Sequence, residues 1–402
     1  MKSGWVTKCI DEIAEVKGGK RVPKGYKLLS EATAHPYLTV SDFTDDGTIK
    51  TENIQYISDD VFKEIKRYTI SSKDVYISIA GTIGKTGVVP PELDGANLTE
   101  NACKLVLKSA VDRDFLLYFT KSQDFYEQAA VNTRVAAQPK LALERLKTIK
   151  LSFPVSIPEQ QRIVGILEKA FASIAAAKAS AEKNLLNIQR LSESFRSALF
   201  SRFWNAWKIE KVCDIGQVFD GPHATPKTVA SGPIFLGISS LRRGEIDLRE
   251  SRHVTEIDFE RWTRRVRPQE GDVVFSYETR LGEVALIPSG LECCLGRRMG
   301  LVRVNRQMIS PEFFVLQYRS PQFQDHLRTK TIHGATVDRI SIKEFPGFPI
   351  RVPKLAEQNE IVDRAKELQL RALALESTYR RKLAALDELK NSLLHQAFTG
   401  QL

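Results

Sequence analysis

An internal repeat is the feature that most restricts how this chain can fold. The stretch SIPEQQRIVGILEKAF at 156–171 returns as KLAEQNEIVDRAKELQ at 354–369, so that Glu159 and Gln160 match Glu357 and Gln358. The two members of each pair are 198 residues apart. The same spacing relates further positions along the chain: Asp74 and Asp272, Ser78 and Ser276, Gly84 and Gly282, and Phe115 and Phe313.

Near the start of each copy the spacing is four residues longer: Trp5 matches Trp207, Ile13 matches Ile215, Val16 matches Val218, and Gly19 matches Gly221. A difference of four residues corresponds to one loop deletion. The chain is therefore predicted to contain two diverged copies of one unit, each a globular part followed by a long helix.

The two helices are indicated by apolar residues that recur at alternating steps of four and three, which is the a/d pattern of a coiled coil. In the first copy this seam is Ile163, Leu167, Ala170, Ile174, Ala177, Ala181, Asn184, Ile188, Leu191, Phe195 and Ala198. In the second copy it is Ile361, Ala365, Leu368, Ala372, Leu375, Tyr379, Lys382, Leu386, Leu389, Leu393 and Gln396.

The order of the segments predicts that the two helices are antiparallel. The second globular part begins around Trp204–Trp207, just after the first helix, and stops at Pro353, just before the second. Because the two ends of a domain commonly lie close together, the second helix should run back along the first. About 40 helical residues make a rod of about 60 Å. We expect a pseudo-twofold arrangement with one globular domain at each end.

Each globular part is predicted to be a mixed α/β (α+β) domain. Strand-like runs such as HPYLTVSDF (35–43) and GPIFLGISSL (232–241) are followed by short helical segments, DRDFLLYFTKS (112–122) and SPEFFVLQYRS (310–320). No segment shows the βαβ rhythm of a nucleotide-binding sheet.

Composition limits the classes of function. The 402 residues are 42% hydrophobic and 27% charged, which is ordinary for two or three globular domains. No run of 18 apolar residues could span a bilayer, and MKSGWVTKCIDE has no apolar signal core, so we expect a cytoplasmic protein without a membrane partner. Five cysteines without a C-x-x-C pair and six scattered histidines predict no metal site and no cofactor. The net charge of +10 favours a polyanionic partner.

Several stretches together resemble the specificity subunit of type I DNA restriction–modification systems. They are Trp5, Gly18-Gly19, GDVVFS (271–276; KDVYIS in the first copy), GATVDRISIKEF (334–345), FPIRVPKLAEQNEIV (348–362) and QPKLALERLKTIKLSFPVSIPEQQRIV (138–164). The resemblance covers essentially the whole chain, with both copies in the expected order. One departure is Gln138-Pro139 in the first copy, where the second has Val337-Asp338.

This resemblance implies a non-catalytic subunit that recognises DNA sequence. Two target recognition domains, 1–155 and 203–353, would each read one half of a bipartite site in double-stranded DNA. Two spacer helices, 156–202 and 354–402, would set the distance between the halves and dock two DNA adenine methyltransferase subunits. Restriction translocase/endonuclease subunits would join this assembly.

The stretch SIAGTIGKTG (78–87) looks at first like a phosphate-binding loop, but its glycines, Gly81 and Gly84, are only three residues apart. The repeat equivalent, YETRLGEVA (277–285), has Glu283 where the first copy has Lys85. A phosphate cradle could not make this exchange, because the carboxylate would repel the anion. A loop that reads base edges could, since lysine or arginine suits guanine and an acidic group accepts from cytosine. A solvent-exposed turn without a ligand is the alternative.

The predicted DNA-contacting residues lie in equivalent loops of the two copies. In the first copy they are Lys20, Arg21, Lys24, Thr82, Lys85, Thr86, Arg134, Gln138 and Lys140. In the second they are His223, Thr225, Lys227, Tyr277, Thr279, Arg280, Arg297, Arg298, His333, Thr336 and Arg339. Phosphate contacts are commoner than base contacts for such side chains, and solvated surface is the alternative for many of them.

Two other classes of function, a DNA-modifying or DNA-cleaving enzyme and a structural scaffold, fit the sequence less well. A stand-alone DNA methyltransferase needs an N/D/S-P-P-Y/F loop, whereas the only double proline is in VVPPEL (88–93). A nuclease needs a D…E-x-K cluster, and acidic residues such as Asp272 and Glu278 lack the matching lysine. A coiled-coil scaffold without DNA readout would not need two diverged domains with basic loop tips.

Overall fold

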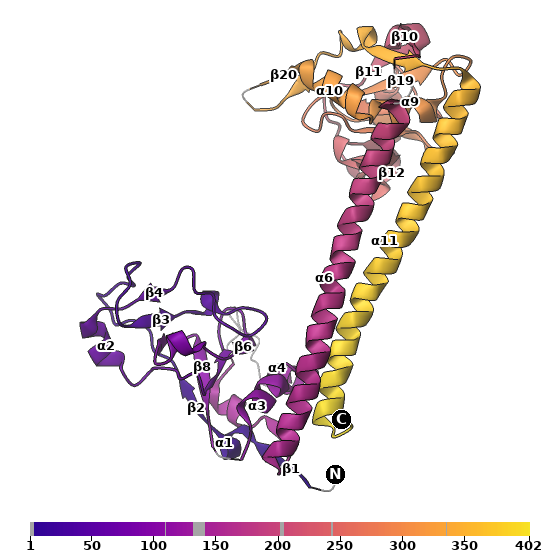
Figure 1. Ribbon diagram of the computed structural model, residues 1–402. Helices are drawn as coiled ribbons and strands as arrows, with labels where there is room; N and C mark the ends of the chain where they lie inside the picture. Colours follow the sequence, from indigo (N-terminus) through magenta and orange to yellow (C-terminus); the bar gives the residue numbers. More distant parts are fainter. Residues whose placement is uncertain (1–3, 109, 132–140, 202–204, 243, 335) are drawn as a thin grey trace. The chain divides into compact units, whose positions relative to one another are not determined.

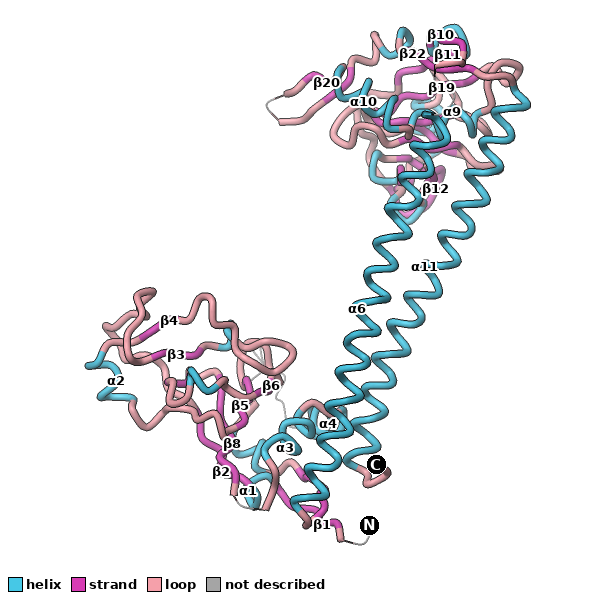
Figure 2. Tube along the Cα trace, viewed as in Figure 1, coloured by secondary structure: helices cyan, strands magenta, loops and turns pink. Residues whose placement is uncertain are grey.

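The computed structural model describes residues 4–108, 110–131, 141–201, 205–242, 244–334 and 336–402. The chain divides into two compact units. The first unit contains Met1–Glu182 and Arg380–Leu402, and the second contains Lys183–Tyr379. The globular parts of these units are called the first and second domain below. Figure 2 shows that each domain combines strands with short helices.

The first domain is built on a four-stranded antiparallel sheet in the order β2-β8-β5-β6, formed by Ala14–Gly18, Ala102–Leu107, Val75–Ser78 and Thr86–Gly87. A second sheet has the order β4-β3-β7, formed by Gln55–Tyr56, Pro36–Leu38 and Asn97–Leu98. The ends of the domain meet in an antiparallel pair, β1 (Trp5–Cys9) with β9 (Lys150–Pro154).

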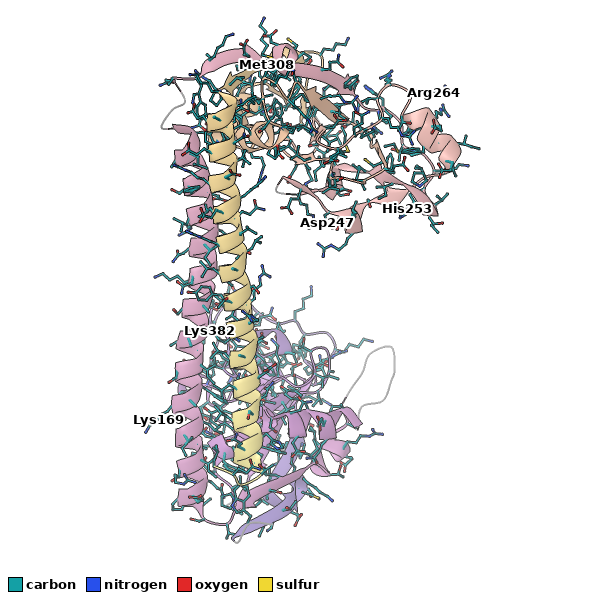
Figure 3. All side chains as sticks on the ribbon, turned by 90° about the vertical axis from the view of Figure 1, so that its right-hand side faces the viewer. Lys169, Asp247, His253, Arg264, Met308 and Lys382 are labelled. Atoms are coloured by element: carbon teal, nitrogen blue, oxygen red, sulfur yellow. The ribbon has the colours of Figure 1, made fainter. Side chains whose placement is uncertain are left out.

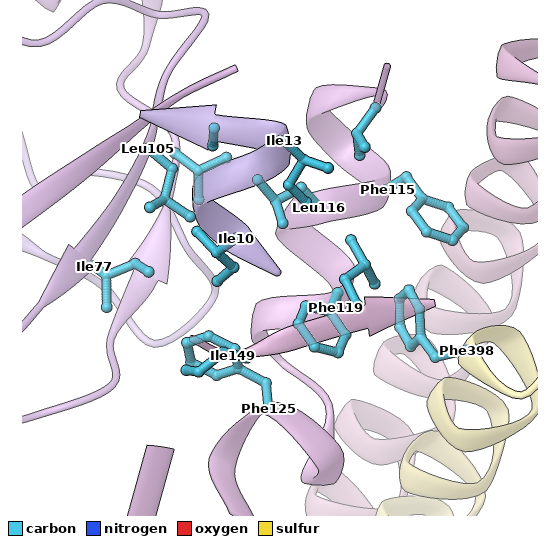
Figure 4. Packing of buried hydrophobic residues seen from close by; sticks show 14 of the residues in the cluster. Ile10, Ile13, Ile77, Leu105, Phe115, Leu116, Phe119, Phe125, Ile149 and Phe398 are labelled. Carbon is cyan, nitrogen blue, oxygen red and sulfur yellow. The ribbon is translucent and has the colours of Figure 1, made fainter. Parts of the chain in front are cut away.

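Short helices cover the first domain: α1 (Ile10–Ile13), α2 (Asp59–Ile65), α3 (Arg113–Thr120), α4 (Gln123–Val131) and α5 (Leu143–Lys147). Two 3₁₀ turns, η1 (Val40–Asp42) and η2 (Pro91–Leu93), complete it. The core lies where α1 and α3 meet the sheet and the last turn of the chain's second long helix (Figure 4). Phe398 packs edge-on against Phe115 and Phe119, with ring centroids 5.1 and 5.4 Å apart.

The second domain repeats this topology. Its main sheet has the order β11-β19-β16-β17, formed by Gly216–Asp220, Met299–Val304, Val273–Ser276 and Val284–Leu286. Its second sheet has the order β15-β12-β18, formed by Arg252–His253, Val229–Leu236 and Cys293–Leu295. In both copies the last pair of this sheet, β3 with β7 and β12 with β18, is parallel. The end-to-end pair is β10 (Lys208–Lys211) with β22 (Pro349–Val352).

The remaining elements of the second domain differ more from the first copy. Its helices are α7 (Val212–Ile215), α8 (Glu256–Trp262), α9 (Pro311–Tyr318) and α10 (Pro321–Thr329), with 3₁₀ turns η3 (Ile238–Ser240), η4 (Leu248–Glu250) and η5 (Phe345–Gly347). The second domain also contains two small hairpins, β13 (Leu241–Arg242) with β14 (Glu245–Ile246) and β20 (Thr331–Ile332) with β21 (Arg339–Ile340).

Each domain is followed in sequence by a long helix, α6 (Ile157–Ser201) after the first and α11 (Leu355–Phe398) after the second (Figure 1). Within the first unit they are antiparallel, because Arg162 contacts the carbonyl of Leu402 while Lys178, sixteen residues later, pairs with Asp387 at 2.7 Å. Within the second unit the amide of Asn184 donates to the Tyr379 hydroxyl at 3.1 Å. The prediction of two long antiparallel helices is confirmed.

A buried glutamine joins each long helix to its domain. The side chain of Gln160 accepts from the Asp112 backbone N–H at 2.7 Å and donates to the carbonyls of Pro154 and Ala110 at 2.8 and 3.2 Å. Its counterpart Gln358 makes the same three contacts, with Ser310, Pro353 and Met308. Both glutamines are 0% exposed. The repeated Glu-Gln motif therefore ties the first turn of each helix to the end of a strand and the start of a short helix.

The predicted seam of the helices is correct at many positions along both helices and wrong at several others. Ile163, Leu167, Ile174 and Ala181 are buried as predicted. Leu191, Leu375 and Leu389, however, are 64%, 48% and 47% exposed. Ser192 and Glu376, one residue later than two of these leucines, are the half-buried residues there. An α-helix drifts by about 20° per heptad from an ideal 3.5-residue repeat, so a strict a/d pattern does not stay on one face over six heptads.

Candidate nucleic-acid interface

The turn after the central strand of each domain is held by the same buried serine. The Ser78 hydroxyl donates to the Thr82 carbonyl at 2.5 Å and accepts from the Lys85 backbone N–H at 2.8 Å. In the second domain the Ser276 hydroxyl donates to the Arg280 carbonyl. Both serines are 0% exposed. The scaffold of the turn is thus repeated although the side chains at its tip differ.

The tips of these turns carry charges that are paired within the protein. The Lys85 ammonium donates to the Phe43 carbonyl at 2.9 Å and lies 3.0 Å from the Asp45 carboxylate, with a side chain only 25% exposed. Arg280 pairs with Glu283 at 2.8 Å. The turn in the first domain is not followed by a helix, since β6 comes next. Lys85 is therefore engaged with its own domain, which argues against a phosphate cradle at this turn.

The first strand of each main sheet is followed directly by a glycine where another backbone passes very close. A Cβ atom on Gly19 would lie 2.0 Å from the Thr99 carbonyl oxygen, and one on Gly221 would lie 2.3 Å from that of Met299. Only glycine fits at such a distance. The loops that carry Lys20 and His223 leave the sheet at this point in both domains, which explains why the glycine is common to the two copies.

In the second domain several predicted residues form one cluster around Asp220. His223 lies between Asp220, 2.7 Å from its Nε2, and Arg298, whose Nη1 is 3.2 Å from its Nδ1. The Tyr277 hydroxyl donates to Asp220 at 2.8 Å, and Arg298 pairs with Glu278 at 3.0 Å. Burial, and then the contact with Asp220, raises the pKa of Tyr277.

The backbone of this cluster is strained and joined to a hairpin. Thr279 and Arg298 have φ values of 67° and 62°, in the left-handed region that residues other than glycine seldom adopt. The Thr279 N–H donates to the Asp338 carbonyl at 3.1 Å, and Glu278 forms an isolated β-bridge with Arg339. His333, whose Nδ1 lies 3.1 Å from Asp338, follows β20 of this hairpin. The structure thus brings together four segments of the second domain: the loop after β11, the turn after β16, Arg298 and the β20–β21 hairpin.

In the first domain the predicted residues form two groups. Arg21 pairs with Glu100 at 2.5 Å, and the Lys20 ammonium lies 5.8 Å from the centre of the Tyr68 ring. Burial raises the pKa of Glu100, but the hydrogen bond from Arg21 opposes it and leaves the pKa below its usual value. The second group lines a hollow of about 210 Å³ at the turn: Thr44, Asp45, Thr82, Ile83, Gly84, Lys85, Thr86, Lys121 and Tyr126.

Two of the predicted DNA contacts are corrected by their burial. Thr86 is 4% exposed in β6, and Tyr277 is 3% exposed beneath the turn, so neither side chain reaches the surface. Both side chains continue the buried face of the sheet, and the sequence alone did not show where the strand ends and the exposed turn begins. Arg134, Gln138 and Lys140 lie outside the described residues.

The other predicted residues are surface positions with few contacts to the clusters. Thr225 and Arg297 line a separate hollow of about 210 Å³ beside Phe235, Ser239 and Arg252. Lys24, Lys227 and Thr336 are exposed.

Sequence reasoning missed two pairs of basic residues that follow helices α2 and α8. Lys66-Arg67 and Arg264-Arg265 are exposed, and within the described chain no ion pair or side-chain hydrogen bond is formed by any of the four. The signal was present as two adjacent basic residues at the same place in both copies. It was not distinctive, because the sequence alone does not tell a paired arginine from an unpaired one.

The acidic residues that a nuclease would use have structural roles here. Asp272 is 3% exposed and accepts from Arg303 at 2.7 and 2.9 Å, and Asp74 pairs in the same way with Lys104 at 2.9 Å. Glu278 is paired with Arg298. Among the described residues, one group of side chains is close enough to share a metal ion: Cys9, Asp11 and Glu12. Glu12 there accepts from the Cys9 backbone N–H at 2.8 Å as a helix cap.

In the part of the chain that the structure describes, none of the helices is both long and apolar enough to cross a membrane. The long helices α6 and α11 carry charged residues throughout, among them Lys178 and Asp387.

Comparison with known proteins gives consistent matches. The family model described as type I restriction modification DNA specificity domain matches twice, at residues 2–186 and 207–384. The specificity subunit of the type I restriction enzyme EcoKI of Escherichia coli strain K12 is 22% identical, over 100% of this chain and 90% of that protein. The specificity subunit of EcoBI, also from Escherichia coli, is 24% identical over 43% of this chain, and the matched region spans only 36% of that protein.

Solved structures share the fold. A chain from a structural study of complex assembly and conformational transition of the type I R-M system has a TM-score of 0.76 at 19% identity, over 100% of this chain and 99% of that one. The crystal structure of the HsdS subunit from Thermoanaerobacter tengcongensis has a TM-score of 0.64 at 19% identity, over 100% and 98%. With two copies of the matched domain across its length, this chain belongs to the type I restriction–modification DNA specificity family and is a specificity subunit with two target recognition domains.

Proposed function

We propose that each domain of this specificity subunit reads one half of a bipartite site in double-stranded DNA, with domain limits 1–155 and 203–353. The observation that carries the proposal is the repeated scaffold with different tips. Ser78 and Ser276 hold the same turn, while Lys85 faces its own domain and Glu283 pairs with Arg280. Two domains with one framework and different surface chemistry suit two different half-sites.

The exposed polar residues of the two clusters are the proposed contacts. In the second domain these are His223, Thr279, Arg298, His333 and Arg339, which the turn and the hairpin bring together. In the first domain they are Lys20, Arg21, Lys24 and Thr82. Thr225, Lys227, Arg280, Arg297 and Thr336 stay candidates at the margin of the second cluster. The net charge of +10 supports a nucleic-acid partner through long-range attraction.

As a specificity subunit, the chain works with DNA and with methyltransferase and restriction subunits. More specifically, we propose that helices 156–202 and 354–402 dock two DNA adenine methyltransferase subunits and set the distance between the half-sites. Restriction translocase/endonuclease subunits join the assembly, which acts in the cytoplasm. The purified chain alone should transfer no methyl group to DNA, and methylation should appear when the methyltransferase subunits are added.

A domain exchange tests the reading of half-sites. Residues 1–155 are replaced by the first domain of another family member, with the junction after Pro154 because β1 pairs with β9 up to that residue. Methylation profiling should show that one half of the bipartite motif has changed and the other has not. A change in both halves, or in neither, would contradict the proposal.

A further inference from the structure

The basic pairs after α2 and α8 occupy equivalent places in the two domains. Helix α2 (Asp59–Ile65) is capped by Ser58 and helix α8 (Glu256–Trp262) by Thr255. Each helix is followed at once by a short basic segment, which contains Lys66-Arg67 in the first domain and Arg264-Arg265 in the second. In both copies the second basic residue precedes the buried aspartate, Asp74 or Asp272, by seven positions.

Several cations near these four side chains are paired with carboxylates. Lys63 pairs with Asp60, Arg267 with Glu292, and Arg249 with Asp247. By contrast, among the described residues the pairs 66–67 and 264–265 have no carboxylate partner and are exposed to solvent. Each domain therefore presents two adjacent cations whose charge is not neutralised by the protein.

Each pair lies beside the loop that leaves the sheet at Gly19 or Gly221. In the second domain an open groove of about 530 Å³ has Arg264, Arg265 and Arg261 on one side and Gly221, Pro222 and His223 on the other. The Arg261 guanidinium stacks 5.3 Å from the centre of the Trp262 ring in the same groove. In Figure 3 Arg264 lies at the outer edge of the second domain, on the side away from the two long helices.

The first domain repeats the juxtaposition with different residues. Tyr68, which directly follows Lys66-Arg67, lies under the ammonium of Lys20 from the loop after Gly19. Val22 and Leu28 of that loop pack on the same apolar cluster as Ile65, the last residue of α2. The neighbouring loops, however, differ before a shared Pro-Lys: KRVPK follows Gly19, whereas PHATPK follows Gly221.

We infer that the two basic pairs contact the phosphate backbone of the DNA, one pair at each half-site, and that they position the duplex without reading its sequence. This inference rests on the proposed function. The two adjacent residues are basic in both copies, whereas the loops beside them differ. Such residues suit the phosphate backbone, which is the same at every half-site. Cations at a helix C-terminus also stabilise the helix by interaction with its dipole, so the test must separate binding from folding.

The test is the salt dependence of binding by the full chain assembled with methyltransferase subunits. The double variants are Arg264→Gln with Arg265→Gln, and Lys66→Gln with Arg67→Gln. The slope of log Kd against log salt should fall by about two in each, because each lost phosphate contact removes about 0.9. If the lines converge near 1 M salt, binding at 0.1 M should weaken by roughly 50- to 100-fold. The loss should be equal for the cognate duplex and for one with scrambled half-sites.

Two control variants distinguish the loss of a phosphate contact from a general loss of positive charge and from unfolding. The variant Arg249→Gln with Arg328→Gln removes the same charge from the second domain at arginines paired with Asp247 and Asp325, and its slope should stay close to the wild-type slope. The variant Arg264→Lys with Arg265→Lys keeps the charge and should restore the slope. The variants at 66–67 and 264–265 should unfold close to the wild-type temperature, because these four side chains make no described hydrogen bond and the interaction of an exposed cation with the helix dipole is small.

The outcomes are distinct. An unchanged slope in the glutamine variants would overturn the inference, and so would a changed base preference in a selected library, which would make the pairs readers of sequence. If the wild-type chain prefers no bipartite site but the slope still falls, the proposed function fails while the backbone contact stands.

Discussion

Replacing the buried glutamine that joins a long helix to its domain should destabilise one unit and leave the other intact. The variant Gln160→Met keeps the length and volume of the side chain and removes its three hydrogen bonds. The Asp112 N–H and the carbonyls of Ala110 and Pro154 then lose a partner in a place where Gln160 is 0% exposed. The change therefore isolates the hydrogen bonds from the packing.

The magnitude follows from the number of groups left without a partner. A buried polar group without a hydrogen bond costs about 1–3 kcal/mol, and the apolar side chain recovers part of this by its own burial. A net loss of about 3 kcal/mol is expected for the first unit. In a unit of this size, each kcal/mol of lost stability lowers the melting temperature by about 2–4 °C. The loss of about 3 kcal/mol should therefore lower it by roughly 6–12 °C.

The assay has to report on each unit separately, because a chain of two units does not unfold in one step. Hydrogen exchange measured by mass spectrometry on a temperature series gives this resolution. Peptides from the first unit should lose protection early in Gln160→Met, with the Asp112 amide among the first, while those from the second unit should be unchanged. Gln358→Met should give the opposite pattern through Ser310, Pro353 and Met308.

The neighbouring glutamine supplies the matched control. Gln161 is exposed, and among the described residues its side chain makes one long hydrogen bond, of 3.3 Å to Asp112. Gln161→Met should change the stability by less than about 0.5 kcal/mol. If Gln160→Met melts at the wild-type temperature, the buried hydrogen bonds do not hold the helix to the domain and this reasoning is refuted.

Three further predictions follow from other parts of the structure. Seven residues inserted into both helices at one level, after Glu182 in α6 and after Arg381 in α11, add about 10 Å and should lengthen the preferred spacer by about three base pairs in a library selection; an unchanged spacer would show that the helices do not set it. The level of these sites follows from the contacts of Lys178 with Asp387 and of Asn184 with Tyr379. Asp272→Asn breaks a buried ion pair with the partly exposed Arg303 and should destabilise the second unit by about 2 kcal/mol in urea unfolding, whereas Asp325→Asn on the surface should not. Iodoacetamide at pH 8 should label the exposed Cys213 in the native protein and spare the buried Cys103, Cys293 and Cys294. Burial raises the pKa of each buried thiol to about 12 and so keeps it protonated. Labelling of the three buried thiols at the rate of Cys213 would contradict this prediction.

The repeat and its helices could be predicted because they depend on residue spacing alone. The two copies and their long helices follow from matched positions such as Glu159 with Glu357, and the antiparallel direction follows from the order of the segments. The phase of the seam could not be followed to the helix ends. Leu191 is apolar and stands at the right heptad position, yet it is 64% exposed. The helical repeat of about 3.6 residues differs from the heptad repeat of about 3.5, so this position is rotated away from the partner helix.

The candidate interface could be predicted by segment but not by side chain. The loops after Gly19 and Gly221 and the turns after β5 and β16 are where the sequence placed them. Thr86 and Tyr277 could not be excluded, because burial within a short strand depends on the neighbouring strands. Arg264 and Arg265 could not be singled out either, since their lack of a carboxylate partner is visible only when the chain is folded.

The buried serine that holds each turn affects how the sequence of the turn can evolve. Ser78 and Ser276 bind backbone atoms, so the fold of the turn does not depend on which side chains stand at its tip. Substitutions of an exposed tip residue such as Thr82, unlike those of the ion-paired Lys85 and Arg280, should therefore carry little cost in stability. Selection for a new target sequence then acts on variants that are already folded, and the two copies are free to diverge at different rates.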